Sequence, residues 1–234
     1  MIIRFFNTSV SYRWYVSVSG KRMMNLELSP RLKIIADSIK GYNSVADIGS
    51  DHAYLPIYLV KTFNIKKAVA SDVNKGPVEI SRERLKQYDV EKHVEVRRGD
   101  GLEILEAGET EVIVIAGMGG MLIRDIMEKG KSIIESAKLI ILQPMRDSDC
   151  VRKWIFGNGF DIIDEELVKE DERIYEVIWA SPGSGYMDKD DPMLIGDKII
   201  KKKHPLAAEF IDKKIEELEK VIALLEGKNT INSR

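Results

Sequence analysis

The stretch SVADIGSDHAYLP at residues 44–56 decides the fold. Its apolar run 44–49 has the length of a buried strand and ends at Gly49. Residues 53–63 then place apolar side chains at helical spacing, despite the early Pro56. A glycine between a strand and a helix allows a sharp turn and lets a ligand come close to the backbone. The stretch therefore predicts a strand–turn–helix unit with a binding site at the turn.

The same alternation of elements continues on both sides of this unit. It predicts strands at 68–73, 93–99, 111–117 and 138–144, and helices at 30–40, 77–88, 120–130 and 148–159. Such alternation is typical of βαβ units and a parallel sheet. Residues 160–183 hold two more strands with no helix between them, which indicates an antiparallel hairpin. We therefore expect an α/β, Rossmann-like fold with a mostly parallel seven-stranded sheet that ends in this hairpin.

The chain divides into three predicted segments. Residues 1–23 contain four basic residues and no acidic one, and Met24 follows directly after Met23. We interpret 1–23 as an N-terminal extension, either an upstream start or a dispensable leader, although its composition also has some likeness to a transit peptide. Residues 24–183 form the α/β domain. Residues 184–234 form a polar linker and a C-terminal helical appendage.

The appendage has the pattern of a coiled coil. Its apolar seam repeats every three or four residues: Ala208, Ile211, Ile215, Leu218, Ile222 and Leu225. Fewer than three heptads are too short to stand alone, so we expect pairing with a helix around 193–203. The arm either grips a large substrate or serves as a lid or dimer contact. The basic run 201–204 either meets phosphates or is solvated, and the same alternatives apply to Arg146, Arg152 and Lys153.

Composition excludes several classes of protein. The chain of 234 residues is 44% hydrophobic and carries a formal net charge of −2, so nucleic-acid contact requires a local basic patch. Its single cysteine, Cys150, excludes an internal disulfide framework and a cysteine zinc cluster, and it fits a cytoplasmic protein. No apolar run reaches the roughly 18 residues of a membrane span. We predict no metal and no membrane partner, while the oligomeric state stays open.

Acidic side chains follow three successive predicted strands. Asp47 and Gly49 end the first strand, Asp72 ends the second, and Asp100-Gly101 follows the third. An acid at the end of the second strand is placed to accept the ribose hydroxyls of an adenosine ligand. The chain lacks the GxGxxG pattern that a dinucleotide pyrophosphate needs, which argues against an NAD-linked oxidoreductase. An adenosyl ligand without a diphosphate, S-adenosylmethionine, fits best, although Asp72 and Asp100 are also common turn or cap residues.

Four segments together resemble one known family. DIGSDHAYLP (47–56), GDGLEIL (99–105), IAGMGGMLI (115–123) and IILQP (140–144) resemble the bacterial tRNA (adenine(22)-N1)-methyltransferases. The resemblance covers about residues 24–183, with a family-like helical tail beyond. It implies a class I methyltransferase fold, methyl transfer from S-adenosylmethionine to N1 of adenine 22 in tRNA, and a C-terminal coiled-coil arm. Asp72 departs from relatives that carry glutamate there, but the carboxylate is retained.

The expected cofactor contacts comprise the strand ends and the first part of the glycine-rich turn at 116–120. They are Asp47, Gly49, Asp72, Asp100, Gly101, Ala116, Gly117 and Met118. We assign five further residues around the turn and the fifth strand to the substrate: Tyr54, Gly119, Gly120, Gln143 and Pro144. Plain turn geometry is the alternative for the glycines, and core packing is the alternative for Tyr54. The lack of an Asn/Asp-Pro-Pro-aromatic signature after the fourth strand argues against methylation of the exocyclic N6.

Asp51 and His52 are the predicted catalytic residues. Adenine N1 has an in-plane lone pair, so no proton must leave before the methyl group is attacked. Positive charge then develops on the purine, and a nearby carboxylate stabilises it more in the transition state than in the ground state. Asp51 instead caps the following helix in a second interpretation, and His52 completes a local hydrogen-bond network.

Two other functions fit parts of the pattern. A small-molecule methyltransferase has the same cofactor residues, but would carry a compact cap in place of a protruding arm. A noncatalytic RNA-binding module would bind tRNA without S-adenosylmethionine, and the acids Asp72 and Asp100 argue against it.

Overall fold

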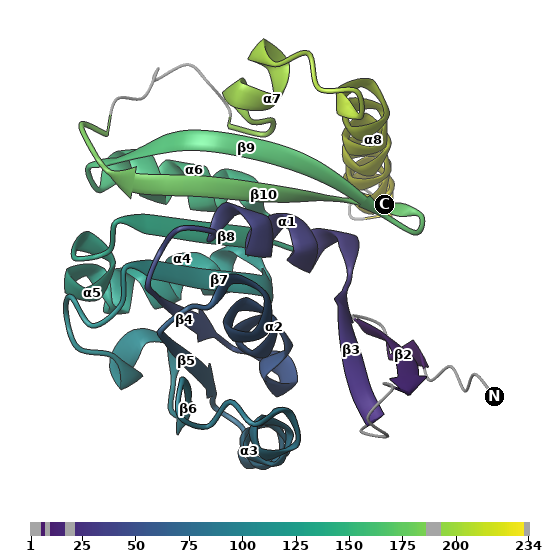
Figure 1. Ribbon diagram of the computed structural model, residues 1–234. Coiled ribbons are helices and arrows are strands. Elements are labelled where there is room, and N and C mark those ends of the chain that lie inside the picture. The colour runs from purple at the N-terminus through teal and green to yellow at the C-terminus, as the bar shows by residue number, and fades with distance from the viewer. Residues whose placement is uncertain (1–5, 8–9, 17–21, 186–192, 232–234) are drawn as a thin grey trace.

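The computed structural model describes residues 6–7, 10–16, 22–185 and 193–231. Its main sheet has seven strands in the order β6-β5-β4-β7-β8-β10-β9 (Figure 1). The strands are β4 (Ser44–Ile48), β5 (Lys67–Asp72), β6 (Val94–Arg98), β7 (Val112–Met118), β8 (Leu139–Pro144), β9 (Phe160–Glu170) and β10 (Arg173–Pro182). The first five run parallel, whereas β10 lies antiparallel between β8 and β9. This confirms the predicted parallel sheet with its terminal hairpin.

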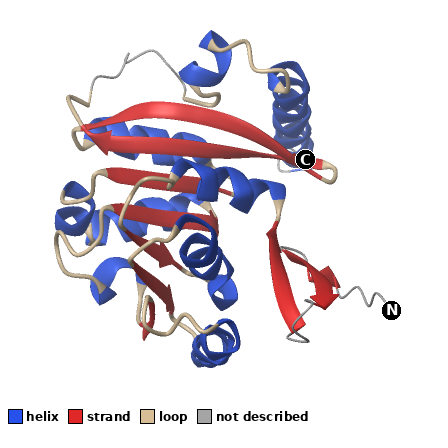
Figure 2. Ribbon diagram, in the orientation of Figure 1, coloured by secondary structure: helices blue, strands red, loops and turns tan. Residues whose placement is uncertain are grey.

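Helices cover both faces of the sheet and make a three-layer structure (Figure 2). They are α1 (Pro30–Ser38), α2 (Tyr54–Phe63), α3 (Lys75–Tyr88), α4 (Gly120–Lys129), α5 (Lys131–Glu135) and α6 (Ser148–Gly157). Strand β8 shows how one strand serves two cores. Leu139 and Ile141 pack in the same cluster as Leu55 of α2, while Ile140 and Leu142 pack in the same cluster as Ile123 of α4. A strand buried on both faces reads as a continuous apolar run, which is why LIIL predicts a central strand.

The strand order reverses between β4 and β7. From β4 the chain moves to β5 and β6 on one side, and it then returns to β7 and β8 on the other. In doubly wound sheets, ligands bind beyond the carboxyl ends of the strands at such a switch point. The switch point therefore lies at Gly49 and at the turn after β7.

The C-terminal elements lie against the hairpin. Helix α7 (Asp197–Lys201) and the first turn of α8 (Ala207–Ile231) pack on β9 through Leu167, Ile199 and Phe210. Helix α7 is short because Lys203 adopts a left-handed conformation (φ 52°) and Pro205 follows, so no long helix forms there to pair with α8. The predicted helical hairpin is therefore wrong.

Helix α8 contacts the tip of the β9–β10 hairpin, where Lys213 donates to the Glu172 carbonyl at 2.8 Å, and it then continues to Ile231. Its seam residues Ile215, Leu218, Ile222 and Leu225 are 45–57% exposed. The helix thus carries an apolar stripe that the described part of the chain leaves uncovered, and the coiled coil stays a prediction.

The N-terminal strands form a second, small sheet. Strands β1 (Phe6–Asn7), β2 (Val10–Val16) and β3 (Arg22–Leu28) are antiparallel in that order. The predicted boundary between residues 23 and 24 falls inside β3. Residues 1–5, 8–9 and 17–21 of segment 1–23 lie outside the described residues.

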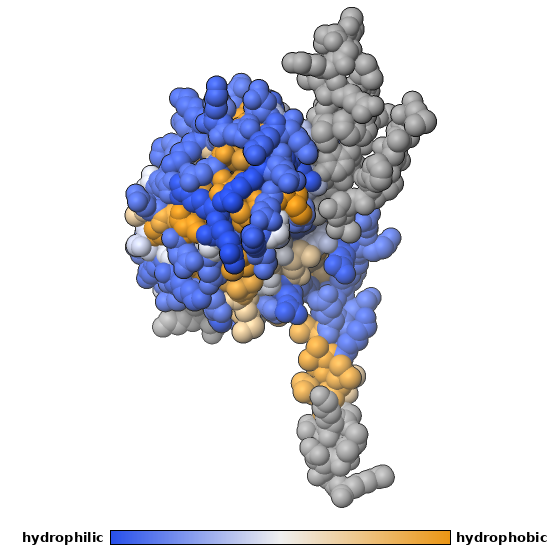
Figure 3. Space-filling model, turned by 90° about the horizontal axis from the view of Figure 1, so that it is seen from below, coloured by the Kyte–Doolittle hydropathy of each residue, from blue (hydrophilic) through white to orange (hydrophobic). Residues whose placement is uncertain are grey.

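None of the described helices is long and apolar enough to cross a membrane. Figure 3 shows the face of the molecule at the β6–α3 edge, where hydrophilic residues cover most of the main lobe.

Candidate active site

The turn after β4 holds the chain in a strained conformation. Gly49 has φ +70°, and a Cβ built there would overlap the side-chain methyl of Met118. His52 and Ala53 follow with φ 65° and 57°, values that residues other than glycine rarely adopt. The Ser50 N–H donates to the Ser71 carbonyl at 2.7 Å and ties the turn to β5. Strain of this kind is concentrated at binding and catalytic sites.

A cavity of about 210 Å³, called the turn cavity below, opens beside Gly49. It lies at the carboxyl ends of β4 and β7, where the strand order reverses. Its lining comes from the glycine turn, the end of β7, the starts of α1 and α2, and the residue after β8: Arg31, Leu32, Asp47, Gly49, Ser50, Asp51, Tyr54, Leu55, Ala116, Gly117 and Met145. The structure thus brings predicted residues from two segments, 47–54 and 116–117, to one place.

The two carboxylates of the turn cavity differ in environment. Asp47 is 7% exposed, and its burial raises its pKa to about 6; the neighbouring Ser50 side chain opposes this shift, and the nearby Asp51 charge adds to it. The Asp51 side chain is 65% exposed, and its Oδ1 lies 3.1 Å from Nε2 of His52. Helix α2 has Ala53 at its N-cap with no side-chain cap bond, so the helix-cap interpretation of Asp51 finds no support.

The predicted adenosine acids lie on the neighbouring strands and outside the turn cavity. Asp72 Oδ1 accepts from the Asn74 N–H at 2.7 Å, and its own carbonyl accepts from the Gly99 N–H. Asp100 and Gly101 line a separate cavity of about 330 Å³ against α4 and α5. The Asp100 side chain is 59% exposed, with Oδ2 3.5 Å from Lys129. Both acids thus keep oxygens that a ligand at this edge of the sheet can reach.

The turn after β7 is tied to the end of β8. Gly117 (φ +78°) donates its N–H to Oε1 of Gln143 at 3.1 Å. Gly120 donates its N–H to the Arg146 carbonyl at 2.9 Å, and a Cβ there would overlap the Asp147 backbone. Gly120 therefore serves close backbone packing. A Cβ at Gly119 would meet only the Arg146 side chain, at 3.5 Å, so this glycine keeps room beside it.

Gln143 acts through its neighbours, because its side chain is fully buried. Its Oε1 accepts from Arg31 Nη1 at 2.6 Å, in addition to the Gly117 N–H, and its Nε2 donates to the carbonyl of Pro144 at 3.0 Å. Pro144 lines a different cleft, on the β10 side. Predicted substrate contacts by these two residues stay predictions, but the geometry gives Gln143 a positioning role.

Arg31 is a residue that the sequence did not indicate. It lies in the first turn of α1, and its guanidinium stacks over the Tyr175 ring at 5.1 Å from the ring centre. Its Nε lies 3.8 Å from Glu170 Oε2, and this nitrogen is buried without a hydrogen-bond partner among the described residues. Since partners at 143, 170 and 175 are remote in sequence, no local pattern pointed to it.

Tyr54 packs inside the protein. It is 4% exposed, and the Arg84 guanidinium lies 4.0 Å from its ring centre. Arg84 also donates to the His52 carbonyl at 2.9 Å, so it supports the strained turn from outside. This geometry favours the core-packing alternative for Tyr54.

Two expected surface cations are engaged with acids. Arg152 is 1% exposed and paired with Glu165 and Glu176, so the prediction of a surface position is wrong. In the basic run 201–204, Lys202 pairs with Asp164 at 2.5 Å and Glu166 at 3.5 Å, Lys201 pairs with Asp197 at 2.6 Å, and His204 contacts Glu166, so acids oppose three of its four residues. Lys153 is 52% exposed, as expected.

The geometry fits an adenosyl ligand. Asp72 and Asp100 lie at the carboxyl ends of β5 and β6. Gly49, at the end of β4, leaves a space that a Cβ would fill, and the buried Asp47 carboxylate lies beside it. Among the described residues there is no group of His, Cys, Asp and Glu side chains arranged to hold a metal ion.

Comparison with known proteins decides the family. The family model described as tRNA (adenine(22)-N(1))-methyltransferase (TrmK) matches residues 45–234. The chain belongs to this family. It is 36% identical over 209 residues to the tRNA (adenine(22)-N(1))-methyltransferase of Bacillus subtilis, with 87% of each chain covered.

Solved structures agree with this membership. The B. subtilis m1A22 tRNA methyltransferase TrmK superposes with a TM-score of 0.79 at 35% identity, covering 86% of this chain and 87% of that one. The Streptococcus pneumoniae protein Sp1610, solved in complex with S-adenosyl-L-methionine, gives a TM-score of 0.78 at 33% identity, with coverage of 83% and 91%. The methyltransferase fold expected from the sequence is therefore confirmed.

Proposed function

We propose that the chain transfers the methyl group of S-adenosylmethionine to N1 of adenine 22 in tRNA. Family membership over residues 45–234 and the Bacillus subtilis relative support the reaction, and the S. pneumoniae complex supports the cofactor. The observation that carries the proposal is the turn cavity itself, where an exposed carboxylate, Asp51, stands at the rim of a buried glycine cradle.

The cofactor site consists of the three strand ends. The buried Asp47 carboxylate faces the turn cavity and is suited to the ammonium of the methionine part, while Asp72 and Asp100 are suited to the ribose and the adenine. Ala116 and Gly117 form the opposite wall, and Met118 packs against Gly49. When bound, S-adenosylmethionine supplies an electrophilic methyl group on a sulfonium.

Asp51 acts on the target base in this proposal. Its carboxylate stabilises the positive charge that develops on the purine as N1 is methylated, and it is placed to accept an N6 proton. His52 holds Asp51 through the 3.1 Å contact, and its own backbone is fixed by Arg84. Gly117 and Gly119 leave space for a flat base, and Gln143 fixes Gly117 on its far side.

The substrate is large, and its target base must leave the tRNA stack to enter a pocket of this kind. Helix α8 supplies a separate docking element beside the hairpin. We assign residues 24–183 to the catalytic domain and 184–234 to the arm. We also propose a cytoplasmic location, which the tRNA substrate and the single cysteine support.

The test uses two unmodified tRNA transcripts that differ only by A22→G. Incubation with methyl-labelled S-adenosylmethionine should label the A22 transcript and leave the G22 transcript unlabelled. Equal labelling of both, or labelling of neither despite cofactor binding, would overturn the proposed target. Methylation of a small molecule without tRNA would favour the alternative enzyme.

A further inference from the structure

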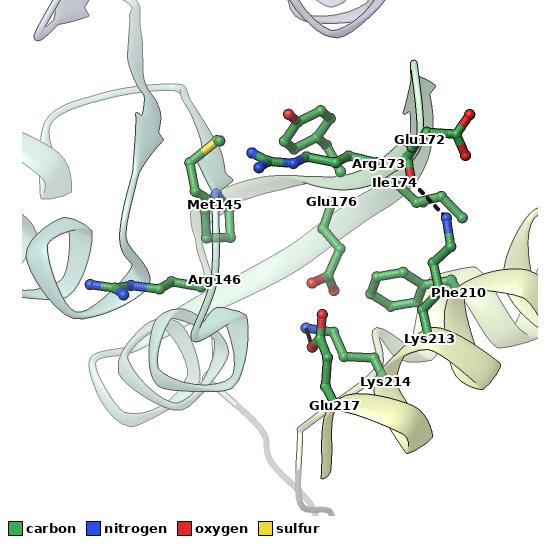
Figure 4. Close-up of a pocket in the computed structure, with 12 residues that line it drawn as sticks. Met145, Arg146, Glu172, Arg173, Ile174, Glu176, Phe210, Lys213, Lys214 and Glu217 are labelled. Atoms are coloured by element: carbon green, nitrogen blue, oxygen red, sulfur yellow. Dashed lines mark hydrogen bonds and ion pairs between the residues drawn. The ribbon is translucent and has the colours of Figure 1, made fainter. Parts of the chain in front are cut away.

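A second cleft, called the arm cleft below, lies between the methyltransferase domain and the base of α8. It has a volume of about 360 Å³, within the range of about 300–1,000 Å³ usual for small-ligand sites. Residues 144–146 after β8 form one wall, residues 172–176 of the β9–β10 hairpin form the floor, and four residues of α8 between Phe210 and Glu217 form the other wall (Figure 4). None of the functional assignments above uses this cleft as a whole.

The arm cleft adjoins the turn cavity. Met145 lines both, and it is 39% exposed. Arg146 lines the arm cleft, and its side chain also lies beside Gly119, at 3.5 Å from the position of a Cβ there. When one nucleotide of a chain enters the turn cavity, the nucleotide next to it therefore lies at the arm cleft. Arg146 stands at the boundary between the two sites.

The available charge in the arm cleft is positive. Four cations line it: Arg146, Arg173, Lys213 and Lys214. Arg146 is 81% exposed with only a 3.5 Å contact to Asp147, Arg173 is exposed, and Lys214 has a loose 3.6 Å pair with Glu217. Exposed pairs of this length contribute little and give way readily to a stronger anion.

Two of the three acids that line the arm cleft are turned to other partners, and the third, Glu217, lies 3.6 Å from Lys214. Glu176 is buried, with one oxygen on Arg152 and the other accepting from Ser148 at 2.6 Å. The Glu172 carboxylate points away from Met145 and Arg146 in Figure 4, and its backbone carbonyl accepts from Lys213 at 2.8 Å. An anion that enters beside Arg146 and Arg173 therefore meets cations.

The arm cleft also offers apolar surface for a base. Met145 lies on one wall, Ile174 on the floor and Phe210 on the arm wall. Flat bases bind to such surfaces without regard to sequence, and the cations hold the backbone beside them.

We propose that the arm cleft binds the nucleotide next to the target adenosine, with the connecting phosphate held by Arg146, Arg173 and Lys214. This inference rests on the proposed function and deepens it. Helix α8 then forms one wall of a nucleotide site. The affinity for tRNA therefore depends on the contact of α8 with β10 as well as on the apolar stripe of α8.

The test measures tRNA binding and methyl transfer by the full chain at several NaCl concentrations. Arg146→Ala and Arg173→Ala should each weaken tRNA binding at all salts and reduce the log–log salt slope by roughly one unit, as expected for one lost phosphate contact. The rate at saturating tRNA and the affinity for S-adenosylmethionine should stay at wild-type values. Lys92→Ala, an exposed cation between α3 and β6, is the matched control and should change neither the affinity nor the slope.

A photo-crosslink provides the positional readout. Transcripts with 4-thiouridine at position 21 or 23 should crosslink to peptides that contain residues 144–146 or 210–217. Crosslinks only outside these peptides, or slopes of both variants equal to that of Lys92→Ala, would overturn the arm cleft while methyl transfer to adenine 22 persists. Loss of methyl transfer by the wild-type enzyme would instead overturn the proposed function.

Discussion

Removal of the Arg152 guanidinium should destabilise the protein strongly. Arg152 is buried at the junction of α6, β9 and β10, where it donates to Glu165 at 2.7 Å and also pairs with Glu176. It further donates to the Met193 carbonyl and the Ser148 hydroxyl, both at 3.1 Å. Burial opposes the charged form, but the Glu176 and Glu165 carboxylates outweigh it and hold the pKa of Arg152 above its ordinary value.

The magnitude follows from what the substitution leaves behind. Arg152→Met keeps the volume but strands the carboxylates of Glu165 and Glu176, which are 1% and 6% exposed. Breaking a buried pair by removing one partner costs about 3–5 kcal/mol, and two stranded acids put the cost near the upper end. At about 2–4 °C per kcal/mol for a chain of this size, the melting temperature should fall by roughly 10–20 °C.

Thermal and urea unfolding, followed by far-ultraviolet circular dichroism, measures the loss. The neighbouring Lys153→Met removes a 52% exposed cation with a single Asp149 partner, and it should change stability by less than about 1 kcal/mol. Adding Glu165→Gln and Glu176→Gln to Arg152→Met should recover a large part of the loss, because no buried charge is then stranded. A loss below about 1 kcal/mol for Arg152→Met, or no recovery in the triple variant, would refute the reasoning.

Three further predictions concern the turn cavity. Gly49→Ala should weaken binding of S-adenosylmethionine by more than threefold in calorimetry, since a side chain is strained at φ +70° and its Cβ displaces the Met118 methyl; binding within threefold of wild type would contradict this. The affinity for the cofactor should fall as the pH decreases through about 6, because Asp47 becomes protonated there and loses its negative charge. Asp47→Asn should bind the cofactor weakly, with an affinity that does not change with pH. If the variant keeps the pH dependence of the wild type, Asp47 is not the group that binds the cofactor. Asp51→Asn should lower kcat by roughly 100-fold at unchanged cofactor affinity, and wild-type turnover would exclude a catalytic role.

Local sequence patterns predicted most of the fold. The alternation of apolar runs with amphipathic segments is set within ten or so residues, so strands such as 138–144 and the hairpin at 160–183 were predictable. Glycine and aspartate at strand ends pointed to the switch point because parallel strands bring their carboxyl ends to one edge. The helix expected around 193–203 is shorter in the structure, α7 (Asp197–Lys201), because the positive φ of Lys203 and the packing of Ile199 on β9 depend on tertiary structure.

The residues that the sequence missed or assigned wrongly are those whose contacts come from distant parts of the chain. Arg31 joins Gln143 and Tyr175, which lie on β8 and β10, and nothing near Arg31 in the sequence signals that contact. Arg152 looks like a surface cation in its helix, and only the acids of β9 and β10 explain its burial. Tyr54 was assigned to a base because an aromatic near a glycine turn suits stacking, whereas Arg84 from α3 covers its ring.

The most direct test of the account identifies the methylated nucleoside. Unmodified tRNA is treated with the enzyme and S-adenosylmethionine, digested to nucleosides and to oligonucleotides, and analysed by mass spectrometry beside a reaction with Asp51→Ala. The account predicts N1-methyladenosine at position 22 with the wild-type enzyme and its near-complete loss with the variant. Methyl groups on N6, at another nucleotide, or at equal level with Asp51→Ala would contradict it.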